Sequence, residues 1–323
     1  MDYTLLLIVV LLVVIGLVIL YSTSAYNGQV KFHDSFYYLK KQAFATVLGI
    51  VLMLFVAGMD YHIWQRLAVF GYLAAVSLSV AVMLFGREIN GSKRWLALGP
   101  FSFQPSEFAK VALILFLADL VTKNVKTIGK MWTLCRIMFW ILPIVGLVGA
   151  SNLSTAIIIL GIGVILIFVA SPKYAQFALM GIAGACFMGI FLALESYRLE
   201  RLAIWRNPEK YEKGYQTLQG LYAIGSGGVF GVGIGNSVQK LGFVPEAQND
   251  MIFSIICEEL GLAGAGIIVF LFLLLIWRFF LIASGSRDLF GALIATGAMA
   301  HMMIQVILNI AVVTNTIPNT GIT

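Results

Sequence analysis

Long uninterrupted apolar stretches dominate this chain and limit the folds that it can adopt. A helix needs about 20 residues, at 1.5 Å per residue, to cross roughly 30 Å of hydrocarbon. Nine stretches of about this length cover residues 4–21, 43–59, 67–85, 106–121, 136–150, 154–170, 175–195, 251–277 and 289–312. Within a bilayer only helices and closed barrels satisfy their own backbone hydrogen bonds, and the alternation typical of a barrel is missing. The sequence therefore predicts an all-α polytopic membrane protein with a bundle of about nine transmembrane helices.

The composition excludes an ordinary soluble protein. Of the 323 residues, 60% are hydrophobic and 11% are charged, whereas a soluble domain is about half apolar and about a quarter charged. The first apolar stretch lacks the basic segment and the cleavage site of a signal peptide, so we interpret it as a retained helix. The three cysteines lie in or beside predicted spans and indicate neither a disulfide framework nor a metal site.

Three hydrophilic segments separate the spans, at residues 22–42, 86–105 and 196–250. If the N-terminus is cytoplasmic, alternation places all three on the outer face, and the short inner loops carry lysines and arginines as the positive-inside rule requires. The outer segments are basic as well, which an anionic ligand at that face would explain. We expect residues 196–250 to form one large extracellular loop.

The segment "GSKRWLALGPFSFQPSEFAK", residues 91–110, brings charges to the start of a predicted span. Glu107 and Lys110 are three residues apart and therefore share one helix face. They form either a structural ion pair near the interface or the wall of a polar cavity, because ionisable residues in spans usually face a bundle interior. Lys93 and Arg94 would suit phosphate oxygens, although such a pair is more often a solvated surface.

A glycine-dense segment, "AIGSGGVFGVGIGNSVQKLG", occupies residues 223–242. It lacks the Gly-Lys-Ser/Thr ending of a Walker loop and the strand–helix context of a dinucleotide fingerprint. Glycine accepts positive φ angles, so we favour a tightly turning or re-entrant external loop over direct backbone contact with a phosphate.

Carboxylates lie on both sides of the start of the eighth predicted span. Asp250 suits the N-cap of a helix beginning near Met251, and its half-wet, half-apolar position would also raise its pKa toward that of a general base. Glu258 and Glu259 lie deeper, where acids are costly. We expect both to point inward, to lysine or arginine partners or to water.

These motifs together resemble one family. The ordered segments "KRWLALGPFSFQPSEFAK", "NLSTAI", "YAIGSGGVFGVGIGNSVQKLGFVPEAQNDMIF", "EELG" and "NTIPNTGI" look like the signatures of the SEDS proteins, named for shape, elongation, division and sporulation. The resemblance extends over nearly the whole chain, so residues 1–323 are expected to form a single integral-membrane SEDS domain. Residues 201–216 and the "GNSVQKLG" segment look more like the division and sporulation branch, FtsW and SpoVE, than like RodA.

The resemblance implies an enzyme, a peptidoglycan glycosyltransferase. Such an enzyme polymerises lipid II, an undecaprenyl-pyrophosphate-linked disaccharide-peptide, at the outer face of the bacterial cytoplasmic membrane. Its expected partners are lipid II, a class B penicillin-binding protein, other divisome or wall-synthesis membrane proteins and membrane lipid, with no nucleic acid. No cofactor is assigned with certainty. A divalent cation such as Mg²⁺ is an open option, with no ligands identified.

The resemblance also implies roles for individual residues. Asp250, in the Pro-Glu-Ala-x-x-Asp motif, matches the family's external-loop aspartate and would deprotonate the acceptor sugar hydroxyl. Arg94 and neighbouring cations would stabilise the departing pyrophosphate. The expected substrate-binding residues are Lys41, Arg94, Glu107, Lys110, Gln104 and Glu246.

Two departures from the family pattern stand out. Position 41 is lysine where the family usually has arginine, which weakens the case for bidentate phosphate binding there. The sequence ends at Thr323, where relatives continue through an "LPFxSYGG"-like segment into a tenth span. The chain is therefore expected to lack the final family segment.

Two alternatives to the enzyme stay open. A lipid II flippase would need a polar path through the bilayer, for which the intramembrane acids are candidates. A scaffold that only positions a penicillin-binding protein would leave Asp250 and Arg94 replaceable.

Overall fold

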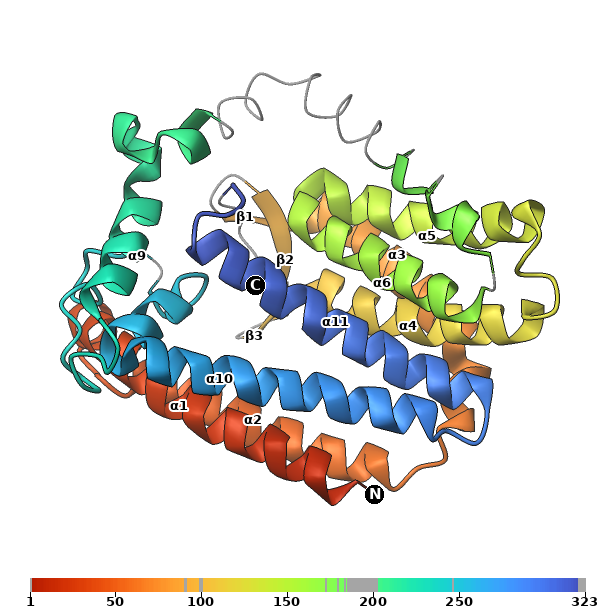
Figure 1. Ribbon diagram of the computed structural model, residues 1–323, viewed down its shortest axis with the longest axis horizontal. Coiled ribbons are helices and arrows are strands. Elements are labelled where there is room, and N and C mark those ends of the chain that lie inside the picture. Colours follow the sequence, from red (N-terminus) through yellow and green to blue (C-terminus); the bar gives the residue numbers. More distant parts are fainter. Residues whose placement is uncertain are drawn as a thin grey trace. The chain divides into compact units, whose positions relative to one another are not determined.

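The protein is almost entirely helical in the computed structural model, which describes residues 2–89, 92–98, 101–171, 173–178, 180–182, 184, 203–245 and 247–318. The long helices are α1 (Tyr3–Phe32), α2 (Tyr37–Ala57), α3 (His62–Phe85), α4 (Pro105–Asn124), α5 (Met131–Ser151), α6 (Leu153–Ala170), α10 (Ile252–Ser284) and α11 (Leu289–Val313). The short elements are β1 (Arg87–Ile89), β2 (Ser92–Leu98), β3 (Phe101–Phe103), η1 (Pro208–Lys210), η2 (Glu212–Gly214) and α9 (Tyr215–Ser226). Figure 1 shows their course along the chain.

The described part of the chain confirms the all-α membrane fold. Seven of its helices are long and apolar enough to cross a membrane: α1, α2, α3, α5, α6, α10 and α11. The predicted span 106–121 is α4, which has 20 residues and includes Glu107, Lys110, Asp119 and Lys123. The predicted span 175–195 lies largely outside the described residues.

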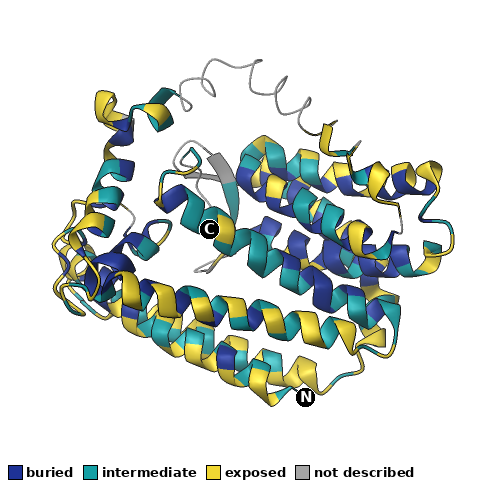
Figure 2. Ribbon diagram, viewed as in Figure 1, coloured by how far each residue is buried: buried dark blue, intermediate teal, exposed yellow. Residues whose placement is uncertain are grey.

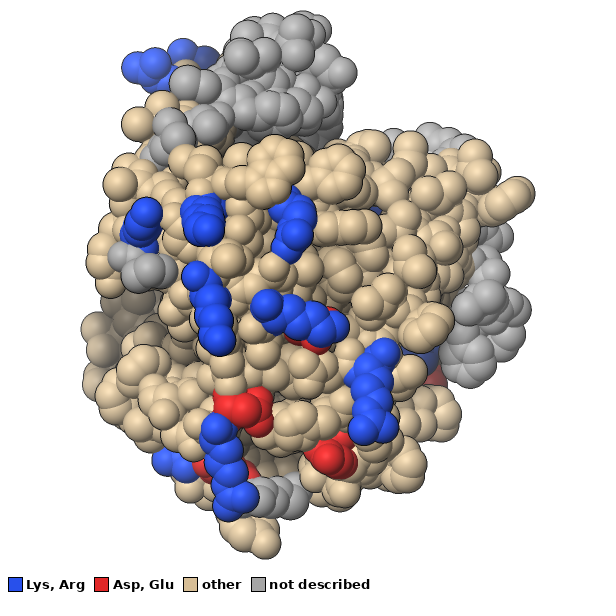
Figure 3. All heavy atoms as spheres, turned by 90° about the vertical axis from the view of Figure 1, so that its right-hand side faces the viewer, with Lys and Arg blue, Asp and Glu red and all other residues tan. Residues whose placement is uncertain are grey.

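The surfaces of these helices fit a lipid environment. None of the residues of α2 is buried, and its exposed side chains include Phe44, Val47, Val51 and Phe55. Figure 2 shows exposed residues along much of α1, α2 and α10. Figure 3 shows lysine and arginine side chains standing out from a mostly uncharged face, with fewer acidic side chains among them. Apolar side chains at such density are stable against lipid tails, where they cost no hydration.

The chain forms two compact units. The first contains Met1–Met59, Ile190–Arg278 and Val306–Thr323, and the second contains Asp60–Gly189 and Phe279–Gln305. In the first unit α1 runs beside α2. It also contacts α10, because Ile19 shares a buried cluster with Ile256 and Ala265.

α1 is longer than its apolar stretch. It continues to Phe32, well past residue 21, so part of the hydrophilic segment 22–42 is helical. The hydroxyl of Ser24 donates to the Leu20 carbonyl oxygen at 2.6 Å, and Ser22, Thr23 and Ser24 are all buried. Polar side chains that bond within the protein allow the helix to continue.

The second unit is a helical core around α4. α3 packs on α4, α5 on α6, and α4 on α6. The Tyr72 ring stacks on Phe116 with centroids 4.3 Å apart, and its hydroxyl donates to the Trp140 carbonyl oxygen at 2.7 Å. These contacts fix the helix from which Glu107 and Lys110 project.

A small antiparallel sheet fills the segment between α3 and α4. Its strand order is β1-β2-β3, and Leu96 pairs with Phe103 where β2 meets β3. The sequence identified residues 86–105 only as a hydrophilic segment between two spans, so the sheet is an addition to that description. β2 carries Arg94 and lies against α3, α4 and α5. The sheet therefore fixes the position of the Arg94 backbone within the second unit.

Candidate functional site

The start of α4 carries a half-buried ion pair. Gln104 occupies the cap position and Pro105 the first helical position, where proline loses no hydrogen bond. Lys110 Nζ lies 2.9 Å from Glu107 Oε2, with the lysine side chain 1% exposed and the glutamate 44% exposed. The other carboxylate oxygen of Glu107, Oε1, is buried and has no hydrogen-bond partner among the described residues. A buried acceptor needs a hydrogen-bond partner, so the partner of Oε1 must come from outside the described residues.

Arg94 and Gln104 line a small cavity in the second unit. The cavity also touches Ser79, Ser151 and Asn152 and has a volume of about 10 Å³, which is close to the minimum for one water molecule. Arg94 Nε donates to the Ser151 carbonyl oxygen at 3.0 Å. The Asn152 amide nitrogen, which is buried, has no partner among the described residues. This cavity suits an ordered water molecule and is too small for a pyrophosphate.

Asp250 lies in the first unit, directly before α10. The helix begins at Ile252, so Asp250 precedes it by two residues and stands outside the cap position that the sequence suggested. The Asn309 side-chain amide donates to the Asp250 carbonyl oxygen at 3.3 Å. The next residue, Met251, is 1% exposed and packs in a cluster with Val244 and Ala247. The backbone around Asp250 is thereby anchored, while its side chain is partly exposed.

A large cavity in the same unit is lined by sequence neighbours of Asp250, although Asp250 itself is not among its lining residues. Its volume is about 500 Å³, within the range of ligand pockets. Apolar residues line one part of it: Val13, Gly16, Leu17, Leu20 and Ile252. Polar residues line the other part: Tyr38, Lys41, Gln42, Thr46, Gln248 and Asn249. The cavity thus offers an apolar wall and a polar rim that includes both residues preceding Asp250.

Lys41 is the positively charged residue among those that line this cavity. Its side chain is exposed, and its Nζ lies 4.5 Å from the centre of the Tyr37 ring. An ammonium group above a ring is held without losing its charge. A lysine in this position can meet an anion as a point charge rather than through the two-pronged contact of an arginine.

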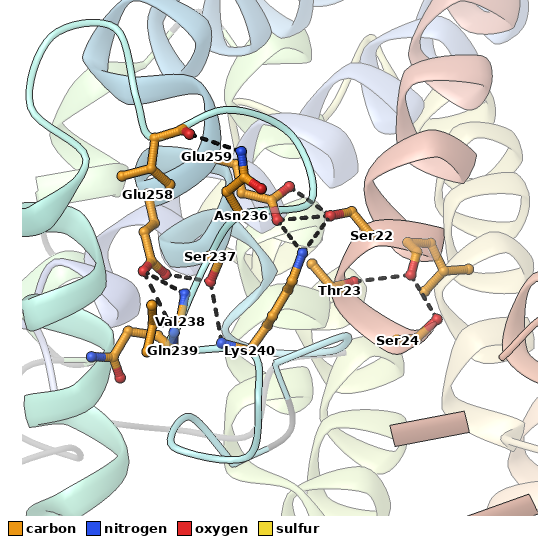
Figure 4. A network of polar contacts seen from close by, with 12 residues as sticks. Ser22, Thr23, Ser24, Asn236, Ser237, Val238, Gln239, Lys240, Glu258 and Glu259 are labelled. Atoms are coloured by element: carbon orange, nitrogen blue, oxygen red, sulfur yellow. Dashed lines mark hydrogen bonds and ion pairs between the residues drawn. The ribbon is translucent and has the colours of Figure 1, made fainter. Parts of the chain in front are cut away.

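The two acids inside α10 are held by the loop of residues 237–240 and by Ser22 of α1 (Figure 4). Lys240 Nζ lies 2.6 Å from Glu259 Oε1 and 3.0 Å from Ser22 Oγ, and the Ser22 hydroxyl donates to Glu259 at 2.7 Å. Glu258 accepts from the Ser237 hydroxyl and from the Val238 backbone N–H, the latter at 3.0 Å. The expectation that both acids would point inward is confirmed for the described residues, with a lysine partner for Glu259.

The structure distributes the predicted site residues between its two units. Lys41 and Asp250 belong to the first, and Arg94, Gln104, Glu107 and Lys110 belong to the second. Glu246 lies outside the described residues, and so does the side chain of Lys93. Among the described residues, no group of three or more histidines, cysteines, aspartates or glutamates is placed to hold a metal ion, so no residue is assigned to a divalent cation.

Sequence reasoning missed two features of the site. It did not pair Ser22 with Glu259, because 237 positions separate them. It did not find the large cavity either, because its lining comes from α1, α2 and the start of α10. The tight turning of the glycine-dense segment is confirmed, since Gly228, Gly231, Gly233 and Gly235 have positive φ angles.

Comparison with known proteins gives consistent matches. Residues 3–323 match the model of the FTSW_RODA_SPOVE family of cell cycle proteins. Stage V sporulation protein E of Bacillus subtilis strain 168 is 39% identical over 335 residues, an alignment that covers 100% of this chain and 90% of that protein. The probable peptidoglycan glycosyltransferase FtsW of Trichlorobacter lovleyi is 34% identical, with 99% of this chain and 86% of that protein covered.

Solved structures show the same similarity. A chain from work on structural coordination of polymerization and crosslinking by a peptidoglycan synthase complex has a TM-score of 0.85 and 28% identity, with 100% of this chain and 90% of that chain covered. The rod shape determining protein RodA of Thermus thermophilus has a TM-score of 0.72 and 26% identity, with 100% and 88% covered.

Proposed function

This chain belongs to the FtsW, RodA and SpoVE family of cell cycle proteins, and from that premise we propose that it is a peptidoglycan glycosyltransferase of the bacterial cytoplasmic membrane. Its substrate is lipid II, which it joins into glycan strands at the outer face during cell division or related wall synthesis. The observation that carries the proposal is the cavity of about 500 Å³, whose lining includes Gln248 and Asn249, the two residues before Asp250. Relatives that share about a third of its residues are named for this activity.

The cavity has the chemistry that a lipid-linked sugar requires. The apolar wall formed by α1 residues such as Leu17 and Leu20 suits a polyprenyl chain, because these side chains pack against it by van der Waals contact, as lipid tails do. Lys41 on the polar rim suits a phosphate oxygen. A molecule with both parts is an amphiphile with an anionic head, and lipid II has that composition.

Asp250 is the proposed general base. Its carboxylate takes the proton from a sugar hydroxyl of the acceptor, and the resulting oxygen attacks the anomeric carbon of the donor. The new glycosidic bond forms as the bond between that carbon and the pyrophosphate oxygen breaks, and undecaprenyl pyrophosphate leaves. Positive side chains stabilise the charge that develops on the leaving group, and we assign this role to Lys41, which lines the cavity, and, on the family resemblance alone, to Arg94.

Glu107 and Gln104 are assigned to substrate binding in the second unit. The side chain of Glu107 is 44% exposed, and the Lys110 ammonium holds one oxygen of its carboxylate in place. Glu246 retains its assignment from the family motif. The segment 196–250 is proposed as the extracellular loop of a single membrane domain.

The protein is proposed to work with a class B penicillin-binding protein, and with other membrane proteins of the division or wall-synthesis machinery. The similarity to a chain of a peptidoglycan synthase complex supports such a partner. A polymerase that is joined to a crosslinking enzyme delivers its product directly to the next reaction.

Asp250→Asn tests the proposal. Asparagine keeps the size and the hydrogen-bonding shape of the side chain but cannot accept the proton. We expect lipid II polymerisation by the purified protein to fall by about 10² to 10⁴, with an unchanged unfolding temperature. The matched control is Asp34→Asn, which removes only an exposed pairing with Lys40 and should leave the rate unchanged. Polymerisation at the wild-type rate in Asp250→Asn would refute the general base.

The flippase and scaffold alternatives predict different results. A flippase variant at Asp250 would keep moving lipid II between leaflets of a vesicle, so translocation must be measured beside polymer formation. A scaffold would tolerate both Asp250→Asn and Arg94→Gln. The intramembrane acids that favoured a transport path, Glu258 and Glu259, are instead bonded to Ser237, Lys240 and Ser22.

A further inference from the structure

The helix α10 is interrupted at the point where its two acids lie. Gly261 has φ 68° and ψ −173°, which is not helical. A break inside a membrane helix frees carbonyl oxygens on one side and N–H groups on the other, and each needs a partner. Broken membrane helices are therefore tolerated only where other parts of the protein complete their hydrogen bonds.

The glycine-dense segment supplies those partners. The Val232 and Gly233 N–H groups donate to the carbonyl oxygens of Glu258 and Glu259, at 3.0 and 2.9 Å. On the other side of the break, the Leu262 and Ala263 N–H groups donate to the Gly228 and Val229 carbonyl oxygens, both at 3.0 Å. The backbone of residues 228–233 thus bridges the break in α10.

The close approach explains the glycines at two positions. A Cβ atom on Gly231 would lie 2.2 Å from the Glu259 carbonyl oxygen, and one on Gly261 would lie 2.4 Å from the Gly231 nitrogen. Both have positive φ angles as well. Neither position has room for a side chain, so the bridge depends on glycine at both.

The acidic side chains then hold the next part of the loop. Residues 237–240 place the Ser237 hydroxyl and the Val238 N–H on Glu258, and the Lys240 ammonium on Glu259 (Figure 4). The side chain of Lys240 is 6% exposed and that of Glu259 is 3% exposed. We call these side-chain contacts of residues 237–240 and Ser22 with Glu258 and Glu259 the loop clamp.

A short path leads from the loop clamp to Asp250. The Val244 N–H donates to the Gln239 carbonyl oxygen at 2.9 Å. Val244 and Ala247 are buried in the cluster that also contains Met251 and Ile255 of the α10 region. The segment that ends at Asp250 is therefore anchored before residue 241 by the clamp and after residue 250 by α10 itself.

We propose that Lys240, Glu258 and Glu259 are positioning residues for the glycosyl transfer, because the loop clamp fixes the segment that carries Asp250. The proposal rests on the function proposed above. Burying two charges costs several kcal/mol per ion, which their attraction only partly offsets, and well-packed apolar residues often give equal or greater stability. What a directional ion pair adds is one defined geometry for the loop. A displacement of about 1 Å at a catalytic group can lower a rate about a hundredfold.

The test separates geometry from stability with one double variant. Lys240→Met or Glu259→Gln alone leaves a buried charge without its partner, so each should lower the unfolding temperature and the rate. Together the two substitutions remove both charges, and the unfolding temperature should return close to the wild-type value. The expected kcat of this double variant stays about tenfold to a hundredfold below wild type, with little change in KM for lipid II. A double variant with wild-type unfolding temperature and wild-type kcat would overturn the proposal.

Matched controls and a second variant keep the result decisive. Lys210→Met with Glu212→Gln makes the same changes at exposed positions and should leave kcat and unfolding temperature unchanged. If the double variant at the clamp does not recover its fold, Ser22→Ala removes only the bridging hydroxyl. We expect a several-fold lower kcat at unchanged KM in Ser22→Ala, and a wild-type kcat in this variant would also overturn the proposal.

A measurement without substrate separates this proposal from the proposed function. The Val238 and Lys240 N–H groups are bonded to Glu258 and to the Ser237 hydroxyl, which the double variant keeps. Their hydrogen exchange should still become faster in the double variant, because the loop has lost the ion pair with Glu259 and opens more often. Unchanged exchange would show that the ion pair does not fix the loop. A failure of the proposed function would give a different result. Asp250→Asn would then keep its polymerisation activity, while hydrogen exchange in the loop would still be faster in the double variant.

Discussion

Lys110 is 1% exposed and its partner Glu107 is 44% exposed, although Lys110 Nζ and Glu107 Oε2 are only 2.9 Å apart. The lysine ammonium is buried and is neutralised by the glutamate, whereas the glutamate side chain is still partly exposed. A buried ammonium without a counter-charge is costly, whereas a half-exposed carboxylate is solvated by water.

The two substitutions at this pair should therefore differ in stability. Glu107→Gln leaves the buried Lys110 charge without an anion and should cost about 1–3 kcal/mol of unfolding free energy. Lys110→Met should cost less, because it removes the buried charge itself. Both should reduce lipid II polymerisation. Thermal unfolding and a polymerisation assay measure the two effects, with the exposed Lys126→Met as control, and equal destabilisation by the two variants would contradict this account.

The break in α10 gives a prediction with a matched pair of glycines. Gly261→Ala places a Cβ atom against the backbone of Gly231 and Val229, at a residue with a positive φ angle. Backbone strain of this kind alone costs roughly 1–3 kcal/mol, so with the added contact the free energy of unfolding should fall by more than that. Gly266 has open space around its Cβ position in the same helix. Gly266→Ala should be neutral or stabilise by up to about 1 kcal/mol. Thermal unfolding of the two variants measures this difference. Equal unfolding temperatures would show that the break in α10 tolerates a side chain at residue 261.

The turn before α11 predicts a pH dependence. The Gly291 N–H donates to Asp288 at 2.7 Å and the Tyr61 hydroxyl donates to it as well, and these bonds, the backbone one first, hold the pKa of Asp288 below its ordinary range. A carboxylate whose pKa is lowered on folding stabilises the protein fully above its unfolded pKa of about 3.9. This contribution to stability is lost as the pH falls through the folded-state pKa.

Asp288→Asn should accordingly lower the unfolding temperature at neutral pH. The difference from wild type should shrink as the pH falls from about 3.9 through the lower folded-state pKa, because the folded wild-type carboxylate then becomes protonated too. Thermal unfolding between neutral and acidic pH measures this, with the exposed Glu209→Gln as control. A difference that stayed constant down to the most acidic pH would argue against a role for the Asp288 charge.

Membrane topology can be tested by cysteine labelling. The predicted outer loop contains Glu212 and the predicted inner loop contains Lys126, and both are exposed. In a background without the native cysteines, a membrane-impermeant reagent added outside should label Glu212→Cys and spare Lys126→Cys. The opposite pattern would place Asp250 on the wrong side for lipid II polymerisation.

The elements of the fold were readable from the sequence because they depend on local chemistry. An apolar stretch of about 20 residues is a membrane helix wherever it lies in the chain, and α3, α5 and α6 appear where the stretches predicted them. The extension of α1 to Phe32 and the sheet of β1, β2 and β3 were not predicted. Both depend on polar groups finding partners within the fold, which hydropathy does not report.

The sequence by itself determined that this is an all-α membrane protein, which motifs it carries, and that Glu258 and Glu259 need partners. Only the tertiary structure decided that Ser22 and Lys240 are the partners of Glu259, and that α1, α2 and residues 248–252 line one cavity. The physical reason is the range of the interactions. Helix formation in lipid is satisfied within a segment, whereas a buried charge or a cavity depends on side chains brought together from distant parts of the chain.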